Sequence, residues 1–374
     1  MKKTALLLIL LTVVSCVSVK VSDTNIKAND KITETNSLTP KKPKNIILLI
    51  GDGTGLSQLS ASLYYNKNTS NYLRFNQISL MKTSSANDLI TDSAAGATAF
   101  ASGVKTNNGV LGLDKNLNTV PTIVEVLSRK GFATGVIATS SIVHATPAAF
   151  YAHVQSRRNY EEIALSLVNS EIDFFAGGGL DFFTQRKDKK NLIETLEKKG
   201  FTINATGLPI QTKPVFNYKQ GYLLAPDGMP KMLEGRGDFL PNATSLAIET
   251  LSQLSETGFF LMVEGSQIDW GGHANNTDYL ISELIDFDKA IGVALDFAQT
   301  NKNTLVIVLA DHETGGFTLA SDNGDYNKIK PTFSTNGHSA TMIPVFAKGP
   351  GQELFSGIYE NTAVFDKMTS LLLN

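Results

Sequence analysis

Residues 45–52 read NIILLIGD, and this stretch decides the fold class. Five consecutive apolar residues, 46–50, are followed at once by Gly51 and Asp52. A short continuous apolar run bounded by a turn signal is typical of a strand buried on both faces of a parallel sheet. Similar runs recur at residues 134–138, 173–177, 259–264, 304–310 and 343–348. The sequence therefore predicts several buried strands spread along the chain.

Amphipathic stretches separate these apolar runs. They cover residues 122–130, 161–169, 190–199, 242–256 and 282–301, and the first ends at Gly131, a favourable helix C-cap. Strands that alternate with helices predict an α/β fold, with a central, mostly parallel sheet, helices on both of its faces and small surface insertions.

The composition is that of a globular domain. The chain has 374 residues, of which 42% are hydrophobic, and a net charge of −2. The length suits one large domain or two medium ones, and we expect a single domain over residues 43–374. The chain has no excess of positive charge that would attract nucleic acid, so we expect no nucleic-acid partner.

The first 16 residues, MKKTALLLILLTVVSC, have the pattern of a signal peptide. Two lysines precede an apolar run that is too short to span a bilayer. Ser15 before Cys16, the only cysteine, resembles a bacterial lipoprotein cleavage site, although Val13 stands where Leu is commonest. An ordinary secretory signal is the alternative. With one cysteine the chain forms no internal disulfide.

Residues 17–42 are rich in Ser, Thr, Asn and Lys, which predicts a flexible tether. We therefore expect an exported bacterial protein, either periplasmic or anchored to a membrane only through a lipid on Cys16.

Three carboxylates stand at the ends of predicted strands. Asp52 follows the first strand, Glu264 closes another, and Asp311 follows a third. Ligands bind outside the carboxyl ends of the strands in open parallel sheets, so these side chains converge on one rim. Like charges placed together repel unless cations lie among them, which predicts a metal site.

The histidines strengthen this prediction. Asp269 and His273 are spaced i, i+4, His312 follows Asp311 directly, and His338 lies in the loop sequence NGHSA. Imidazole and carboxylate together are zinc ligands. His153 lacks an acidic neighbour in sequence, so we interpret it as structural.

Ser93 and Arg157 are candidates for chemistry on an anion. Ser93 begins a run of small residues that suits a tightly packed helix, whose first turn favours an anion, but a plain helix cap explains the same pattern. Arg157 offers a planar fork for two phosphate oxygens, and a charged helix start is the alternative. Arg158 would point elsewhere.

Six stretches together resemble the alkaline phosphatase family. They occur in the family's order, span about residues 45 to 349, and read LLIGDGTG, ITDSAAGATAFASGVKTNNG, HATPAAFYAHVQSRR, MVEGSQIDWGGHANN, LADHETGG and NGHSA. The resemblance implies an alkaline-phosphatase-like fold and hydrolysis of small phosphate monoesters through a covalent phosphoserine, with two Zn²⁺ ions and usually one Mg²⁺ ion.

The resemblance also implies a role for each matching position. Ser93 matches the nucleophile and Arg157 the phosphate-binding arginine. The implied ligands are Asp269, His273 and His338 for the first zinc, Asp52, Asp311 and His312 for the second zinc together with Ser93, and Asp52, Thr146 and Glu264 for the third site.

The chain departs from some family members at two positions. His144 stands where several members have Asp, and we expect it to shift the preference of the third site from magnesium toward zinc. Trp270 stands where some have Lys, and we expect it to weaken phosphate binding.

The sequence between the DHETGG motif and the last histidine is short, from Phe317 to Gly337, and its Gly, Asn and Asp residues predict a surface loop. We expect a homodimer, with a monomer as the alternative. Two alternative functions remain open at this point. Under these alternatives, the chain is either a related phosphodiesterase or sulfatase, or a non-catalytic surface protein that binds phosphate or metal.

Overall fold

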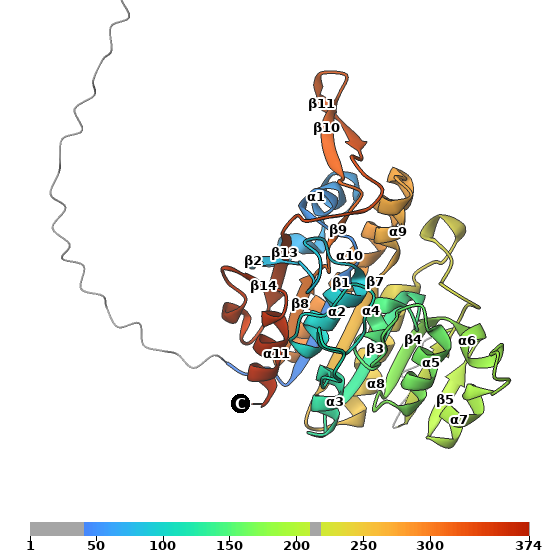
Figure 1. The fold of residues 1–374 in the computed structure, drawn as a ribbon. Helices are drawn as coiled ribbons and strands as arrows, with labels where there is room; N and C mark the ends of the chain where they lie inside the picture. The colour runs from blue at the N-terminus through green and yellow to red at the C-terminus, as the bar shows by residue number, and fades with distance from the viewer. Residues whose placement is uncertain (1–40, 210–217, 374) are drawn as a thin grey trace, which may run out of the picture. The chain divides into compact units, whose positions relative to one another are not determined.

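A computed structural model describes residues 41–209 and 218–373 (Figure 1). The expected signal peptide and nearly all of the expected tether lie outside these residues. The described residues belong to one compact unit that begins at Pro40. Among them, no helix has the length and the apolar character needed to cross a bilayer.

A ten-stranded sheet runs through this unit, in the order β14-β2-β13-β8-β1-β7-β3-β4-β6-β5. The opening stretch of the sequence is β1 (Asn45–Gly51), which lies between β7 (Phe259–Gly265) and β8 (Thr304–Leu309) and is parallel to both. All seven residues of β1 are buried. Its position explains the unbroken apolar run, because neither face of the strand meets water.

The other strands of the sheet are β2 (Gln77–Lys82), β3 (Ala133–Ser141), β4 (Phe174–Gly178), β5 (Phe201–Asn204), β6 (Lys219–Leu223), β13 (Ile343–Lys348) and β14 (Ile358–Glu360). Only β13 is antiparallel to its neighbours, β8 and β2. The predicted α/β class and mostly parallel sheet are confirmed, and each of the six predicted strands is present.

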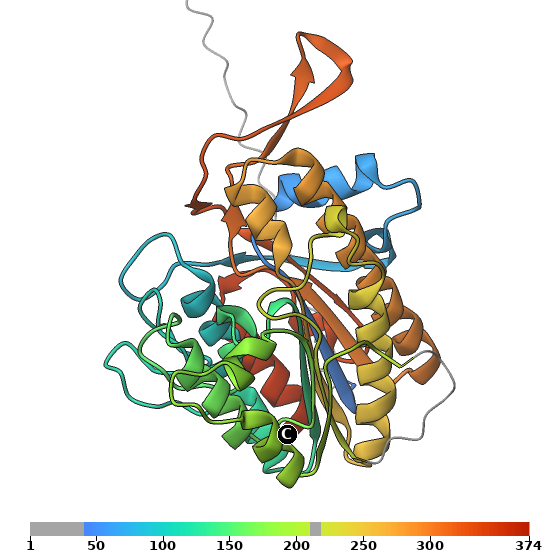
Figure 2. The ribbon, with the colours of Figure 1, turned by 90° about the vertical axis from the view of Figure 1, so that its right-hand side faces the viewer.

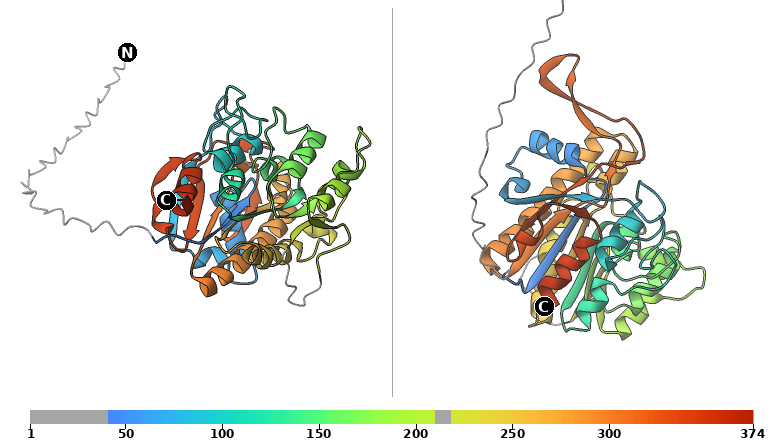
Figure 3. Two further views of the ribbon diagram at one scale, coloured as in Figure 1. Left: turned by 90° about the horizontal axis from the view of Figure 1, so that it is seen from below. Right: turned by 60° about the vertical axis from the view of Figure 1, so that its left-hand side comes forward.

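Helices cover both faces of the sheet, as Figures 2 and 3 show. One face carries α2 (Ser93–Ser102), α3 (Ile123–Ser128), α4 (Ala145–Ala148), α5 (Tyr160–Asn169), α6 (Leu180–Thr184), α7 (Leu192–Lys198) and α11 (Ala363–Leu373). The other carries α1 (Leu56–Tyr65), α8 (Phe239–Leu254), α9 (Gln267–His273) and α10 (Thr277–Asn301). All five predicted amphipathic helices are present, with ends that differ by a few residues.

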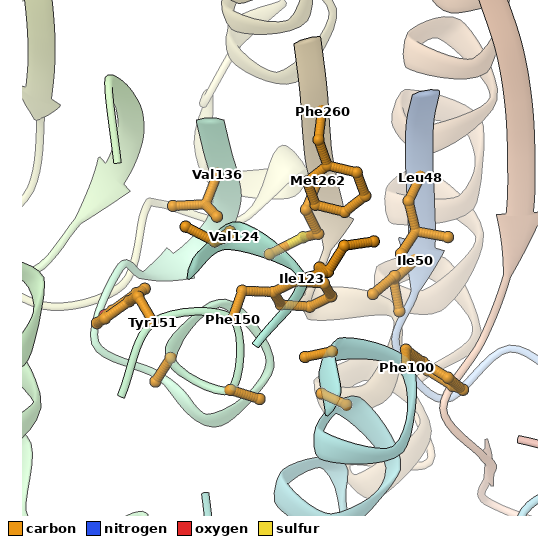
Figure 4. Close-up of a cluster of buried hydrophobic side chains, with 14 of the residues drawn as sticks. Leu48, Ile50, Phe100, Ile123, Val124, Val136, Phe150, Tyr151, Phe260 and Met262 are labelled. Carbon is orange, nitrogen blue, oxygen red and sulfur yellow. The ribbon is translucent and has the colours of Figure 1, made fainter. Parts of the chain in front are cut away.

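A hydrophobic core lies on each face of the sheet, and alternate residues of β1 pack into one core or the other. Leu48 and Ile50 point toward Phe100 of α2 on one face (Figure 4). Phe150 and Phe260 stack in the same core with ring centroids 6.0 Å apart. Full burial of one such side chain contributes about 1.5–3 kcal/mol. This packing fixes α2 against the sheet, close to the end of β1.

The segment 317–337 differs from its prediction. It was expected to be a surface loop, but it contains an antiparallel hairpin of β10 (Thr318–Asp322) and β11 (Asp325–Thr332), which projects from the unit (Figure 1). Asn323 and Gly324 both have positive φ, at 49° and 85°. The Asn-Gly pair that was read as loop is therefore the tight turn of a hairpin.

Candidate metal centre and active site

The carboxyl ends of the central strands hold the charged side chains. Asp52 follows β1, Glu264 lies near the end of β7 in register with Ile50, and Asp311 comes just after β8. All three side chains are buried. The predicted convergence of carboxylates on one rim is confirmed.

The inner group consists of Asp52, Asp311 and His312, which are fully buried and whose ligand atoms lie within 4.8 Å of one another. His312 Nε2 lies 3.5 Å from Asp52 Oδ1 and 3.3 Å from Asp311 Oδ2. Burial lowers the pKa of His312, although Asp311 opposes this effect. A neutral imidazole beside two carboxylates is a set of zinc ligands.

The outer group consists of Asp269, His273 and His338, again within 4.8 Å of one another. Helix α9 carries the first two one turn apart, with His273 Nε2 3.3 Å from Asp269 Oδ2. His338 Nε2 lies 3.6 Å from Asp269 Oδ1 and 3.2 Å from His273 Nε2. The Asp269 hydrogen bond raises the pKa of His273 to about 9.

Backbone carbonyls orient both histidines of the outer group. Asn336 O lies 2.6 Å from His273 Nδ1, and Thr91 O lies 2.8 Å from His338 Nδ1. Each carbonyl requires a proton on Nδ1, so in the neutral form of each ring the Nε2 atom keeps a lone pair for a metal. The two groups meet where the rings of His312 and His338 stack, with centroids 3.5 Å apart.

A third cluster adjoins the inner group and consists of Asp52, Thr146 and Glu264. The Thr146 hydroxyl lies 3.5 Å from Asp52 Oδ2. Ser266 donates a 2.6 Å hydrogen bond to Glu264 Oε2. The three potential ligands offer only oxygen atoms, which suits a hard cation such as Mg²⁺.

Among the described residues, no Lys or Arg forms an ion pair with Asp52, Glu264 or Asp311. Burial raises the pKa of Asp52 well above its ordinary value, and the charge of Asp311 raises it further. Burial also raises the pKa of Glu264 to about 7. Four buried atoms of these clusters and of the adjacent His144 have no hydrogen-bond partner within the described chain: Asp52 Oδ1, Glu264 Oε1, Asp311 Oδ2 and His144 Nδ1. Divalent cations would supply partners for the oxygens and remove the repulsion, so the residues fit metal ions.

Ser93 lies beside the inner group. It is the first residue of α2, and its Oγ is 3.3 Å from His312 Nε2. A Cβ added to Gly96, one turn later, would lie 3.0 Å from Asp311 Cβ, so the small residues of this helix allow its close approach. Asp92 is the N-cap, accepting from Ala95 N. The capping function therefore belongs to Asp92, which leaves the Ser93 hydroxyl free for another role.

Arg157 is held next to Ser93 through the same Asp92. Its Nη1 donates to Asp92 Oδ2 over 3.0 Å, and Gly109 N donates to that oxygen as well. Burial opposes the charge of Arg157, but Asp92 outweighs it and raises the pKa of the guanidinium. The sequence places Asp92 directly before Ser93 at the start of a predicted helix, which is a signal for a helix cap. Nothing in the sequence near Asp92 indicates that Arg157, 65 residues away, pairs with it.

His144 and Trp270 lie together at this centre, with ring centroids 5.8 Å apart in an edge-to-face arrangement. Burial lowers the pKa of His144 to about 3. His153 lies apart from all three clusters. Its Nδ1 is 2.7 Å from Gly112 O and its Nε2 is 3.1 Å from Glu125 Oε1, contacts that fit the structural role expected for it.

Comparisons with known proteins give one family. The sequence model described as alkaline phosphatase matches residues 43–332. Alkaline phosphatase 4 of Bacillus subtilis (strain 168) is 37% identical over 332 residues, which cover 83% of this chain and 71% of that protein. The alkaline phosphatase of Escherichia coli (strain K12) is 32% identical, with 90% and 88% covered.

Solved structures agree. The alkaline phosphatase from the Antarctic bacterium TAB5 is 55% identical and superposes with a TM-score of 0.87, covering 89% of this chain and 98% of that one. Two mutants of the TAB5 enzyme, in which a histidine is replaced by Asp or by Glu, have Mg bound in a site called M3.

Proposed function

Because the chain belongs to the alkaline phosphatase family and is a metal-dependent phosphomonoester hydrolase, we propose that it acts through a covalent phosphoserine on Ser93. The proposal includes two zinc ions and a third ion. Asp269, His273 and His338 would hold the first zinc, Asp52, Asp311 and His312 the second, and Asp52, Thr146 and Glu264 the third, which would be Mg²⁺. When bound, paired cations stabilise the attacking and the leaving oxygen of an in-line displacement.

One observation carries the proposal: the Ser93 hydroxyl faces the inner group at 3.3 Å from His312 Nε2, while Arg157 is fixed one residue away on Asp92. In the reaction, Ser93 Oγ releases its proton to solvent and attacks phosphorus, the bond from phosphorus to the alcohol oxygen breaks, and the leaving oxygen takes up a proton from water to depart as the alcohol. Water then gives up a proton and attacks phosphorus, the Ser93 Oγ–P bond breaks to release inorganic phosphate, and Ser93 Oγ takes up a proton again.

The remaining residues bind and orient the phosphoryl group. Arg157 can donate two hydrogen bonds to its non-bridging oxygens, because Nη1 is already held by Asp92 and the fork is pre-oriented. The N-terminus of α2 adds partial positive charge where the substrate phosphate would lie. Both interactions hold the phosphorus in line with Ser93 Oγ.

The central test is an assay with a simple aryl phosphate monoester and the matching diester, on the wild type and Ser93→Ala, with and without a chelator. We expect monoester activity to dominate and to fall by several orders of magnitude, on the order of 10³ or more, in Ser93→Ala and with chelator. Rapid quenching with labelled monoester should trap phosphate on the wild-type protein only. Undiminished activity in Ser93→Ala would refute the proposal.

The same assay separates the alternatives. A phosphodiesterase would cleave the diester at least as well. A sulfatase needs a Cys or Ser to modify within a motif of its own, and the chain has no Cys within the fold. A non-catalytic binding protein would bind phosphate equally well with or without the Ser93 hydroxyl.

We also propose that His144 and Trp270 tune the centre. His144 lies two residues before Thr146, and its buried Nδ1 has no hydrogen-bond partner among the described residues, so it can act as a further ligand that favours zinc over magnesium. The Mg-bound TAB5 mutants, in which Asp or Glu replaces a histidine, are consistent with this role. His144→Asp should increase the magnesium dependence of activity. Trp270→Lys should strengthen inhibition by inorganic phosphate, because it adds a positive charge.

Location and assembly complete the proposal. We propose export to the periplasm or to a membrane surface through a lipid on Cys16, since residues 1–16 have a signal-peptide pattern. We further propose a homodimer. Globomycin-sensitive processing and light scattering of the purified protein test these two points.

A further inference from the structure

Thr314 lies between the two proposed zinc groups, and neither the motifs nor the ligand sets assign it a role. It belongs to the two-residue strand β9 (Glu313–Thr314), which pairs with β12 (His338–Ser339) so that Thr314 is opposite His338. Its side chain is fully buried. The Thr314 N–H donates to Gly53 O over 3.1 Å, directly after Asp52.

The hydroxyl of Thr314 contacts one ligand from each group. It donates to Asp269 Oδ1 of the outer group, and it lies 3.2 Å from His312 Nδ1 of the inner group. An ionised carboxylate only accepts, so the single hydroxyl proton goes to Asp269. The contact with His312 can then be a hydrogen bond only if Nδ1 carries the ring proton and donates it to Thr314 Oγ1.

This chain of donors fixes two features of the centre. It places the lone pair of His312 on Nε2, the atom that lies 3.3 Å from Ser93 Oγ. It also holds Asp269 Oδ1, and with it the orientation of a carboxylate whose Oδ2 lies 3.3 Å from His273 Nε2. One side chain thus sets the tautomer of one ligand and the orientation of another.

The methyl group of Thr314 has a separate contact. A Cβ added to Gly272, the residue before His273, would lie 3.0 Å from Thr314 Cγ2. Two substitutions therefore separate these contacts. Valine keeps the methyl group that packs against α9 but lacks the hydroxyl, and serine keeps the hydroxyl but lacks the methyl group.

We propose that Thr314 is a positioning residue that couples the two metal groups through its hydroxyl, so that loss of this one group weakens Zn²⁺ binding at both. The inference rests on the proposed function in taking both groups as zinc sites. Removal of the outer hydrogen-bond partner of a metal ligand costs about 10–100-fold in affinity.

The test compares wild type, Thr314→Val and Thr314→Ser. Thr244→Val is the matched control, because Thr244 is also a fully buried threonine whose hydroxyl donates to a carbonyl, Leu240 O, within α8. Zinc affinity is measured on the metal-free proteins by competition with a chromophoric chelator. Visible absorption of Co²⁺-loaded protein reports the ligand geometry of each site, and circular dichroism checks folding.

We expect Thr314→Val to bind both zinc ions about 10–100-fold more weakly and to change the Co²⁺ spectrum. Thr314→Ser should retain affinity within a fewfold of wild type, and Thr244→Val should leave both readouts unchanged. An unchanged affinity in folded Thr314→Val, a loss at one site only, or an equal loss in Thr314→Ser would each overturn the inference. Failure of the wild type itself to bind zinc would overturn the proposed function instead.

Discussion

Two buried clusters of acidic residues in this molecule differ in where their positive charge comes from. In one, Glu283 and Asp286 of α10 surround Arg236. In the other, Asp52, Glu264 and Asp311 lie together at the carboxyl ends of the central strands, with no Lys or Arg ion-paired to any of the three among the described residues. In the first cluster, an arginine of the chain neutralises the negative charge. In the second cluster, the negative charge is neutralised only when cations bind.

In the Arg236 cluster, one guanidinium contacts both carboxylates and a backbone carbonyl. Arg236 Nη2 contacts Glu283 and lies 2.8 Å from Asp286 Oδ2, and Nη1 donates to Pro230 O. The side chains have 0–1% of their surface exposed. Burial raises the pKa of both acids, and Arg236 counteracts it. The cluster ties segment 225–236 to α10, and in this segment Gly228 lies against the indole of Trp270.

In the Asp52 cluster, by contrast, the buried carboxylates lie next to one another. Burial raises the pKa of Asp52, and the charges of its acidic neighbours Asp311, Asp269 and Glu264 raise it further. Buried charge that the chain neutralises itself gives a fixed support, whereas buried charge left without a partner gives a place for a cation. The two clusters should therefore respond in opposite ways to loss of one charge.

The largest effect is expected from Arg236→Met. The substitution removes the cation and leaves the charges of two buried carboxylates uncompensated, although Met232 N–H still donates to Glu283, and this costs about 3–5 kcal/mol of unfolding free energy. Urea unfolding of the metal-loaded protein, followed by circular dichroism, measures this loss. Added zinc should not restore it, since the defect lies away from the metal centre.

A triple variant, Arg236→Met with Glu283→Leu and Asp286→Leu, controls for packing. It removes the charges together, so it should recover most of the lost stability, because an apolar replacement of a buried ion pair is often neutral or stabilising. If Arg236→Met alone unfolded at the same urea concentration as wild type, the cluster would have no structural role.

A smaller effect, with opposite signs in the two metal states, is expected from Asp52→Asn. A raised pKa means that the folded metal-free protein binds the extra proton, so its stability falls as pH rises. Removal of this charge should stabilise the metal-free protein at alkaline pH by about 1–2 kcal/mol. In the metal-loaded protein, the same change removes a ligand and should lower stability.

Asp288→Asn is the matched control for this prediction. Asp288 is also buried, and burial raises its pKa too, but Ser70 and Asn71 donate hydrogen bonds to its carboxylate that oppose this rise and that the substitution would disrupt. Its loss should destabilise the protein by a similar amount whether or not metal is bound. The same sign for Asp52→Asn in both metal states would contradict the contrast drawn between the clusters.

The sequence predicted the Asp52 cluster but not the Arg236 cluster, for a physical reason. Asp52, Glu264 and Asp311 follow apolar strands whose carboxyl ends must meet in a parallel sheet, so their convergence follows from topology. Arg236 lies 47 and 50 residues from its partners. Nothing local marks that pairing, which depends on how a loop packs on α10.

The difference between local sequence patterns and tertiary contacts also explains which strands and side-chain roles were predicted. The central strands were predicted because burial on both faces leaves an unbroken apolar run. The strand β2 near the sheet edge was not, because its residues alternate in burial. The shared role of Asp92, as helix cap and as partner of Arg157, depends on tertiary contacts across 65 residues.

The smallest effect is expected from a third pair, His153 and Glu125, in which both charges belong to the chain but lie nearer the surface. Their side chains are 19% and 32% exposed. The hydrogen bond with Glu125 raises the pKa of His153 above 6.5, and the hydrogen bond with His153 lowers the pKa of Glu125 below 4.5. Solvent screening limits such a pair to about 0.2–1 kcal/mol.

Glu125→Gln tests this pair, because glutamine keeps the capping box that Glu125 forms with Thr122 but removes the charge. The raised pKa of His153 gives stability that is complete below pH 6.5 and lost as pH rises through its folded pKa. The lowered pKa of Glu125 gives stability that is complete above pH 4.5 and lost as pH falls. Wild type and variant, both metal-free, should therefore differ most in urea unfolding between pH 4.5 and 6.5 and converge at alkaline pH. A difference that stayed constant from this range up to alkaline pH would show that the pair acts as a neutral hydrogen bond, unlike the ion pairs of the Arg236 cluster.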